Sequence, residues 1–170
     1  PTLGGHTWFE KPALLYWMMI ASYRMFGISE WTARLGPAVC GLLTIVAVWC
    51  VAREVNRDFG FWSVIVTASC LGLIVFSRAA SFDVVVTMTT TWALACFLLR
   101  ELRKMPVYLI GFYAFVGLSL PAKGLVGVVI PFGVVGAYYL LRRAWPERSV
   151  WLSLIWGVPL VPAVSAVWYG

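Results

Sequence analysis

The stretch Arg78-Ala-Ala-Ser-Phe-Asp83 contains two opposite charges between two long apolar runs. An uncharged run over residues 59–77 leads into it, and a second over residues 84–99 leads out of it. Asp83 therefore lies where one apolar segment ends and the next begins. An ionisable group at such a depth is costly in a bilayer, and it is usually paired or functional. We expect the apolar runs to form the fold and Asp83 to belong to its site.

The composition is that of an integral membrane protein. Of the 170 residues, 62% are hydrophobic and only 12% are charged, with a mean hydropathy of +0.88. Soluble domains average about 25% charged residues. The net charge of +6 would favour nucleic acid as a partner of a soluble chain. In a membrane protein it reflects basic cytoplasmic loops, so membrane lipids are the expected surroundings and no nucleic-acid partner is predicted.

Six apolar segments follow a polar beginning. Residues 1–11 are interpreted as the end of an outer loop, and residues 12–27 as an interfacial helix, because their apolar part is shorter than the ~20 residues that span a bilayer. Within residues 31–169, each later segment must satisfy its own backbone hydrogen bonds in hydrocarbon and should be a helix. These predicted spans are residues 31–52, 59–77, 84–99, 106–122, 125–141 and 150–169.

The predicted fold class is therefore all-α, a polytopic bundle of about six transmembrane helices plus one interfacial helix. The chain starts at Pro1, without a Met or a basic signal region, and stops directly after an apolar run. We expect it to be an internal fragment, residues 1–170, of a longer transmembrane domain.

Charged connecting segments between the spans, which we call joints, orient the predicted bundle. If the spans alternate in direction, the joints at residues 53–58, 100–104 and 142–148 share one side of the membrane, and they hold eight of the 13 basic residues. Cytoplasmic loops have the excess of Lys and Arg, so this side is predicted to be cytoplasmic. The outer side receives the other five: Lys11, Arg24, Arg34, Arg78 and Lys123. Trp49 and Trp151 near the inner interface agree with this orientation.

Charged residues of both signs gather on the predicted outer face, beside the apolar spans. They are Glu10, Lys11, Arg78, Asp83 and Lys123. Lysines hold phosphate as point charges, so the set suits a ligand with an anionic head and an apolar tail. Ser81 is predicted to cap the helix that begins at Asp83, and Arg78 is the expected local partner of Asp83. A structural explanation stays open, since lysines also reach out to headgroups and acids favour helix N-termini.

Neither a metal site nor a cofactor is predicted, and a divalent-metal requirement is left open. His6 has no Cys or acidic companion at ligand spacing. The four cysteines lie inside apolar runs without a C-x-x-C pair, and they are interpreted as small apolar side chains: Cys40, Cys50, Cys70 and Cys96. No Walker motif, G-x-S-x-G or H-E-x-x-H occurs.

Several short motifs occur in the order typical of the GT-C superfamily of polytopic membrane glycosyltransferases. Phe9-Glu-Lys-Pro12 is similar to the F-E-K-P motif, Ser81-Phe-Asp83 to S-P-D and Ala122-Lys-Gly124 to T-K-G. The chain thus resembles the bacterial aminoarabinose transferases that modify lipid A and the protein O-mannosyltransferases, glycosyltransferase families 83 and 39. It departs from their pattern at Trp8, Ala13, Phe82, Ala122 and Leu125, but both lysines of the motifs are present.

The resemblance implies transfer of a sugar from a polyprenyl-phosphate donor to a hydroxyl or phosphate of a lipid or protein acceptor. The reaction would take place at the outer, periplasmic face of the bacterial inner membrane. By similarity, Lys11 and Lys123 bind the donor phosphate, Asp83 is a catalytic residue, and Glu10 and Arg78 support the site. The main catalytic acid of such enzymes lies in an outer loop upstream of the matched motifs, so this chain is expected to lack it.

A membrane transporter or lipid flippase is the alternative function, with the outer charges as a gate or a lipid-head site. Transporters often have internal repeats and helices broken near the midplane. No repeat is found, although Pro131, Pro159 and Pro162 are candidates for breaking spans. A purely structural scaffold is a third reading. Transfer of a sugar to an acceptor, as opposed to movement of an unmodified lipid, distinguishes the first two.

Overall fold

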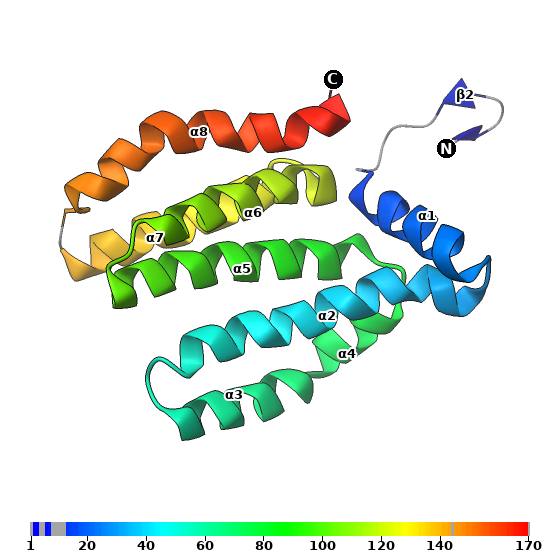
Figure 1. Cartoon of the computed structure of the whole chain (residues 1–170), viewed down its shortest axis with the longest axis horizontal. Coiled ribbons are helices and arrows are strands. Elements are labelled where there is room, and N and C mark those ends of the chain that lie inside the picture. Colours follow the sequence, from blue (N-terminus) through cyan, green and yellow to red (C-terminus); the bar gives the residue numbers. More distant parts are fainter. Residues whose placement is uncertain (1, 4–5, 8–12, 144, 170) are drawn as a thin grey trace.

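The computed structural model describes residues 2–3, 6–7, 13–143 and 145–169, and these are almost entirely helical (Figure 1). Two short strands, β1 (Thr2–Leu3) and β2 (His6–Thr7), pair antiparallel near the N-terminus. From residue 13 onward the described chain forms eight helices: α1 (Leu14–Phe26), α2 (Glu30–Ala52), α3 (Arg57–Ala68), α4 (Leu71–Arg78), α5 (Phe82–Arg103), α6 (Val107–Lys123), α7 (Val126–Arg142) and α8 (Arg148–Tyr169). The predicted all-α class is confirmed.

The second predicted span, residues 59–77, is not one helix but two. Its parts α3 and α4 meet at a bend of 58°. Cys70 between them has an extended backbone, and the hydroxyl of Ser69 donates to the carbonyl of Val66 at 3.0 Å. Local bonds of this kind compete with the helical ladder. The uncharged composition of the run hid the break, because composition does not report where backbone hydrogen bonds go.

Helix length separates the predicted spans into two groups. Among the described helices, α2, α5 and α8 are long and apolar enough to cross a membrane, and the bent pair α3 and α4 adds a fourth span if it counts as one. The apolar helices α6 and α7 have 17 residues each, fewer than the ~20 that span hydrocarbon. Counted by helix length, the described chain has three or four membrane spans, fewer than the about six that the sequence predicted. Pro131, Pro159 and Pro162 lie inside α7 and α8 without ending them.

The helix α5 lies at the centre of the bundle. It packs against α2, α6 and α7, while α3 and α4 contact mainly α2, and α8 packs on α6 (Figure 1). Because consecutive helices reverse direction, the joints that follow α2, α5 and α7 share one end, which we call the Arg100 end. The joints that follow α4 and α6 lie at the opposite end with α1, and we call this the Asp83 end.

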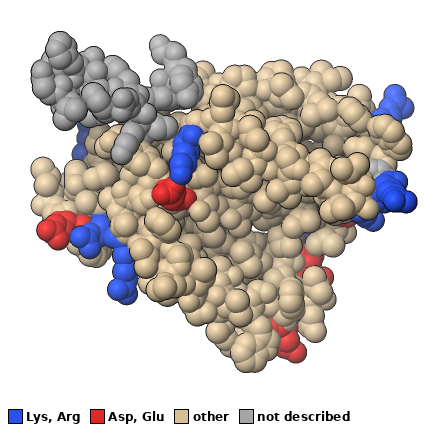
Figure 2. Space-filling model, turned by 180° about the vertical axis from the view of Figure 1, so that it is seen from behind, with Lys and Arg blue, Asp and Glu red and all other residues tan. Residues whose placement is uncertain are grey.

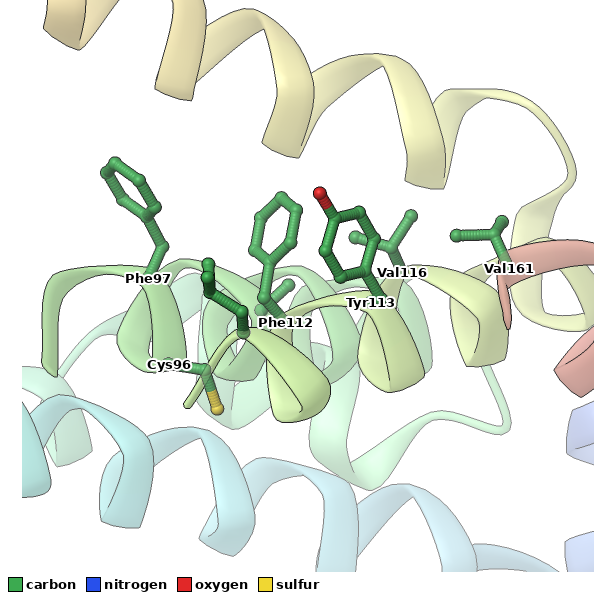
Figure 3. Packing of buried hydrophobic residues seen from close by; sticks show 8 residues of the cluster. Cys96, Phe97, Phe112, Tyr113, Val116 and Val161 are labelled. Atoms are coloured by element: carbon green, nitrogen blue, oxygen red, sulfur yellow. The ribbon is translucent and has the colours of Figure 1, made fainter. Parts of the chain in front are cut away.

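The core between α5, α6 and α8 is rich in aromatic residues. Phe97, Phe112 and Tyr113 are buried and point toward α7, whereas Cys96 points to the side of α2 (Figure 3). All four cysteines are free thiols. The hydroxyl of Tyr113 shares a hydrogen bond of 3.0 Å with that of Ser153 on α8. These contacts bind α8 to α6 through both apolar packing and one buried polar pair.

Ion pairs join the joints at the Arg100 end. The side chain of Arg100 is only 2% exposed and pairs with Glu101 and with Glu147, the latter at 2.6 Å. Arg103 pairs with Glu54, which follows α2. A buried guanidinium is stable only when its charge is compensated, so Arg100 requires these acids. The three joints that alternation placed on one side of the membrane are thus connected to one another.

Acidification should weaken the contacts of Glu54 and Glu147. Hydrogen bonds from Arg103 and Lys104, respectively, are the largest causes that hold the pKa of each carboxyl below its usual 4.5. Since the folded protein binds these protons less readily than the unfolded one, the stabilisation is complete above the usual pKa and is lost as the pH falls through the lowered pKa. We expect the Tm of the full-length protein in detergent to fall below roughly pH 4.5.

A double variant, Glu54→Gln with Glu147→Gln, is the control for this pH dependence. It should have a lower Tm at pH 7 and a smaller decline on acidification, because two of the titrating partners are gone. Parallel Tm profiles for the variant and the wild type would show that the two carboxylates do not contribute.

The contact between α6 and α8 should not tolerate a side chain at Gly157. A Cβ at that position would clash with the ring of Tyr113. Overpacking of this kind costs typically 1–3 kcal/mol, so Gly157→Val should lower the free energy of unfolding by about that amount. At Gly133 a Cβ meets nothing within 4 Å, and Gly133→Val is the matched control. Denaturation in mixed micelles measures both, and equal losses would contradict the packing described.

Candidate functional site

Asp83 and Lys123 meet at the Asp83 end of the bundle. Asp83 lies in the first turn of α5 and Lys123 is the last residue of α6, and the two helices pack closely along their length. The ammonium of Lys123 forms an ion pair with Oδ1 of Asp83. Both side chains remain about half exposed, at 46% for Asp83 and 48% for Lys123. The site is thus a solvent-accessible pair of one acidic and one basic side chain at the end of an apolar bundle.

Two hydrogen bonds with Ser81 hold Asp83 in place. As the N-cap of α5, its hydroxyl oxygen accepts the backbone N–H of Asp83 at 3.1 Å, which confirms the predicted cap. The same hydroxyl donates to Oδ2 of Asp83 at 3.1 Å. A carboxylate in the first turn of a helix is also favoured by the helix dipole. Three local effects therefore hold this side chain in place before any ligand binds.

Gly124 places Lys123 at the tip of its helix. The helix α6 ends there because Gly124 has a φ of 69°, a backbone conformation that residues other than glycine rarely adopt. The backbone N–H of Gly124 donates to the carbonyl of Leu120 at 2.7 Å and closes the last turn. The lysine stem is thereby anchored, while its ammonium extends toward α5.

The helix α1 packs beside the pair. Leu15 of α1 is buried in one cluster with Val84 and Ala122, the immediate neighbours of Asp83 and Lys123 in the sequence. The ring of Tyr16 meets that of Phe82 edge to face, with centroids 5.7 Å apart. The predicted residues Glu10 and Lys11 lie outside the described residues, so their roles stay predictions.

Arg78 is not the partner of Asp83, contrary to the sequence-based expectation. It is exposed at the end of α4 and lines a cavity of about 310 Å³ between α2 and α4. Within the described chain, the ion pair of Asp83 is with Lys123, 40 positions away. The packing of α5 on α6 decides this choice, whereas nearness in sequence favoured Arg78. The signal for the correct pair was that both residues stand at facing ends of neighbouring spans.

The surface around the bundle is mostly uncharged. Figure 2 shows Lys, Arg, Asp and Glu in small groups, separated by broad areas without charge. Large apolar side chains such as Leu42, Phe61, Val66 and Ile155 are exposed. Such a surface is unfavourable in water and suits lipid, which agrees with an integral membrane protein.

The pair has the chemistry of an anion site. A lysine ammonium that is bonded to a carboxylate can exchange this partner for a phosphate oxygen, because both are charge-assisted acceptors. In the part of the chain that the structure describes, no three His, Cys, Asp or Glu side chains are grouped as metal ligands would be.

Comparison with known proteins identifies the family. Residues 10–169 match the family described as dolichyl-phosphate-mannose-protein mannosyltransferase. The match covers nearly the whole chain, and the chain belongs to this family of membrane glycosyltransferases.

The chain is similar in sequence to curated proteins that are described as glycosyltransferases, among them the following two. The undecaprenyl phosphate-alpha-4-amino-4-deoxy-L-arabinose arabinosyl transferase of Yersinia enterocolitica is 27% identical over 99% of this chain and 33% of its own length. The putative mannosyltransferase YycA of Bacillus subtilis is 21% identical over 96% of this chain and 24% of its own length. The chain thus spans about a third or less of the curated relatives it matches.

Solved structures of a related protein have the same fold. ArnT from Cupriavidus metallidurans in the apo state superposes with a TM-score of 0.85 at 26% identity, over 97% of this chain and 32% of that protein. Its complex with undecaprenyl phosphate gives a TM-score of 0.82 at 26% identity, over 97% of this chain and 31% of that protein. The resemblance to the GT-C glycosyltransferases is confirmed.

Removing the Ser81 cap should destabilise the site. Replacement of an N-cap serine by alanine typically costs about 1 kcal/mol, and we expect this loss in the free energy of unfolding for Ser81→Ala. Ser63→Ala is the matched control, because its hydroxyl bonds to the carbonyl of Phe59 within α3 and caps no helix. Unfolding in mixed micelles measures both variants. A loss at Ser81 no larger than that at Ser63 would contradict the capping role.

Proposed function

We propose that the full-length protein transfers a sugar from a polyprenyl-phosphate donor to a hydroxyl or phosphate of a lipid or protein acceptor. The observation behind this proposal is the half-exposed pair of Lys123 and Asp83 at the end of an apolar bundle. A donor of this class needs a cation for its phosphate and hydrocarbon beside it for its tail. ArnT, a protein of the same fold, is known in a complex with undecaprenyl phosphate, which supports the donor class.

Lys123 binds the donor phosphate in this proposal, together with Lys11 on the strength of the resemblance. When the phosphate arrives, its oxygens replace the carboxylate of Asp83 on the lysine ammonium. Until then Asp83 keeps Lys123 extended toward the site and prevents it from turning to other anions. Asp83 therefore acts on the reaction by positioning Lys123, a narrower role than direct catalysis.

The proposed reaction is a displacement at the anomeric carbon of the sugar. An acceptor oxygen attacks this carbon and forms the new glycosidic bond, while the bond from the carbon to the phosphate oxygen breaks. The polyprenyl phosphate departs with the electron pair, and Lys123 stabilises its growing negative charge. The acceptor proton passes to a carboxylate base that another part of the full-length protein supplies.

The proposed orientation places this reaction at the outer face of the membrane. The joints at the Arg100 end hold eight of the 13 basic residues, and an excess of Lys and Arg marks cytoplasmic loops. The Asp83 end then faces the periplasm of a bacterial inner membrane, where a donor lipid and its acceptor meet.

Removal of the Lys123 charge should reduce sugar transfer. Hydrogen bonds to charged groups contribute about 1.5–3 kcal/mol, so we expect Lys123→Ala to lower kcat/KM for the donor roughly 10- to 100-fold. Lys123→Arg should recover part of the rate because it restores the charge. Lys104→Gln, at the Arg100 end, is the matched lysine control and should transfer at the wild-type rate.

The assay uses the full-length protein in membranes with a radiolabelled polyprenyl-phosphate sugar, and it follows the label to the acceptor. Transfer by Lys123→Ala at the wild-type rate would remove Lys123 from the donor site. Label that stays on the carrier while the carrier crosses the bilayer would replace the transferase by the flippase alternative.

A further inference from the structure

An apolar groove opens at the Arg100 end, where its mouth at Arg143 lies about 25 Å along α7 from the start of that helix, and it extends back along α7 to Phe132. It is a cavity of about 620 Å³ with walls on α7 and α8 and a floor on α6. In the described chain α7 and α8 each pack on α6 and little on one another, which leaves the space between them open. Ligand sites in proteins measure about 300–1,000 Å³, so this groove is large enough to hold a bound molecule.

The interior of the groove suits hydrocarbon. Phe112 and Tyr113 form its floor, and they point toward α7 (Figure 3). The polar hydroxyl of Tyr113 is already bonded to Ser153, so it offers little to a polar ligand. On the α7 wall, Gly136 contributes no side chain, and a Cβ there would meet nothing within 4 Å. Empty apolar space forfeits dispersion contacts, which a lipid chain would restore.

The mouth of the groove has a free cation. Arg143 lines it and is exposed, and among the described residues its guanidinium has neither an ion pair nor a hydrogen bond. Its neighbour Arg142 differs, since that side chain pairs with Glu101 and bonds to Tyr138. Arg100, Arg103 and Lys104 of this end are likewise paired with acids. Arg57 and Arg148 have no such partner among the described residues, but neither lines the groove.

Two tryptophans flank the same mouth. Trp145 is 87% exposed and Trp151 is 52% exposed, and both line the groove. Tryptophan collects at the level of lipid headgroups, so these side chains mark the interface between hydrocarbon and water. The groove therefore begins at headgroup level beside an unpaired arginine and continues into the apolar layer.

We propose that this groove binds an anionic phospholipid from the leaflet at the Arg100 end. One acyl chain lies between α7 and α8, and Arg143 compensates the net negative charge of the headgroup, which the choline of a zwitterionic lipid would already cancel. A neutral apolar molecule would leave Arg143 without a partner, and a free phosphate would leave the groove empty. Basic pockets between transmembrane helices are known binding places for anionic headgroups. The proposal concerns a different end of the molecule from sugar transfer and does not depend on it.

The test uses the full-length protein in nanodiscs that contain phosphatidylglycerol with a diazirine on one acyl chain. After photolysis, mass spectrometry maps the adducts on the protein, and phosphatidylcholine with the same chains serves as the neutral probe. We expect phosphatidylglycerol adducts on the groove walls in α7 and α8. Arg143→Gln should lower these adducts about fivefold without changing those of phosphatidylcholine.

Filling the groove should block it. Gly136→Phe places a ring in the open space, and we expect it to reduce the adducts on the groove walls at least fivefold. Gly133→Phe is the matched control on the same helix, since that position is equally open but does not line the groove. Arg57→Gln controls for loss of charge elsewhere at this end. If Gly136→Phe fails to fold, the exposed substitution Arg143→Gln still decides the proposal.

Three outcomes would overturn the proposal. Equal labelling of the wild type and Gly136→Phe would place the lipid outside the groove. Equal labelling by the two lipids in the wild type would remove the role of Arg143. Absence of adducts in the folded wild type would show that another segment of the full-length protein, or a partner helix, covers the groove.

Discussion

The packing of α5 on α6 is the contact on which the rest of the bundle depends. It is the largest interface of α5, and it connects the two buried clusters that hold α1 at one end and α7 and α8 at the other. Because the two helices run in opposite directions, the first turn of α5 meets the last turn of α6. The pair of Asp83 and Lys123 follows from this geometry alone. A substitution that separated α5 from α6 would therefore remove the site as well as the core.

Much of the architecture could be predicted because the membrane permits few alternatives. Apolar runs between charged joints must be helices, and the Ser81 cap and the end of the interfacial helix near residue 27 were visible in the residue types themselves. The break at Cys70 and the partner of Asp83 were not. The first depends on a local side-chain bond to the backbone. The second depends on which helices pack together, and the positions of Asp83 and Lys123 at the ends of neighbouring spans allow this pairing without deciding it.

The two ends of the bundle handle charge differently. At the Arg100 end most cations pair with acids of the same chain, which fixes the joints. Within the described residues, Arg143 is the cation without such a partner that lines the groove. At the Asp83 end the paired side chains remain half exposed and can change partners. The buried centre of the Arg100 end is the pair of Arg100 and Glu101, whereas the pairs around it are exposed to a degree similar to that of Asp83 and Lys123. Ion pairs thus connect the joints at the Arg100 end, and in the proposed function the pair at the Asp83 end exchanges its carboxylate for a donor phosphate.

The short helices α6 and α7 have a consequence for the bilayer itself. Each is about 25 Å long, several ångströms less than the ~30 Å hydrocarbon core. This hydrophobic mismatch is relieved when the membrane thins beside the two helices or when flanking side chains reach outward, at a modest cost per ångström. Lys123 stands at the end of one of them. Where thinning relieves the mismatch, the Asp83 end lies in a shallow depression of the leaflet, which brings lipid headgroups closer to the paired charges.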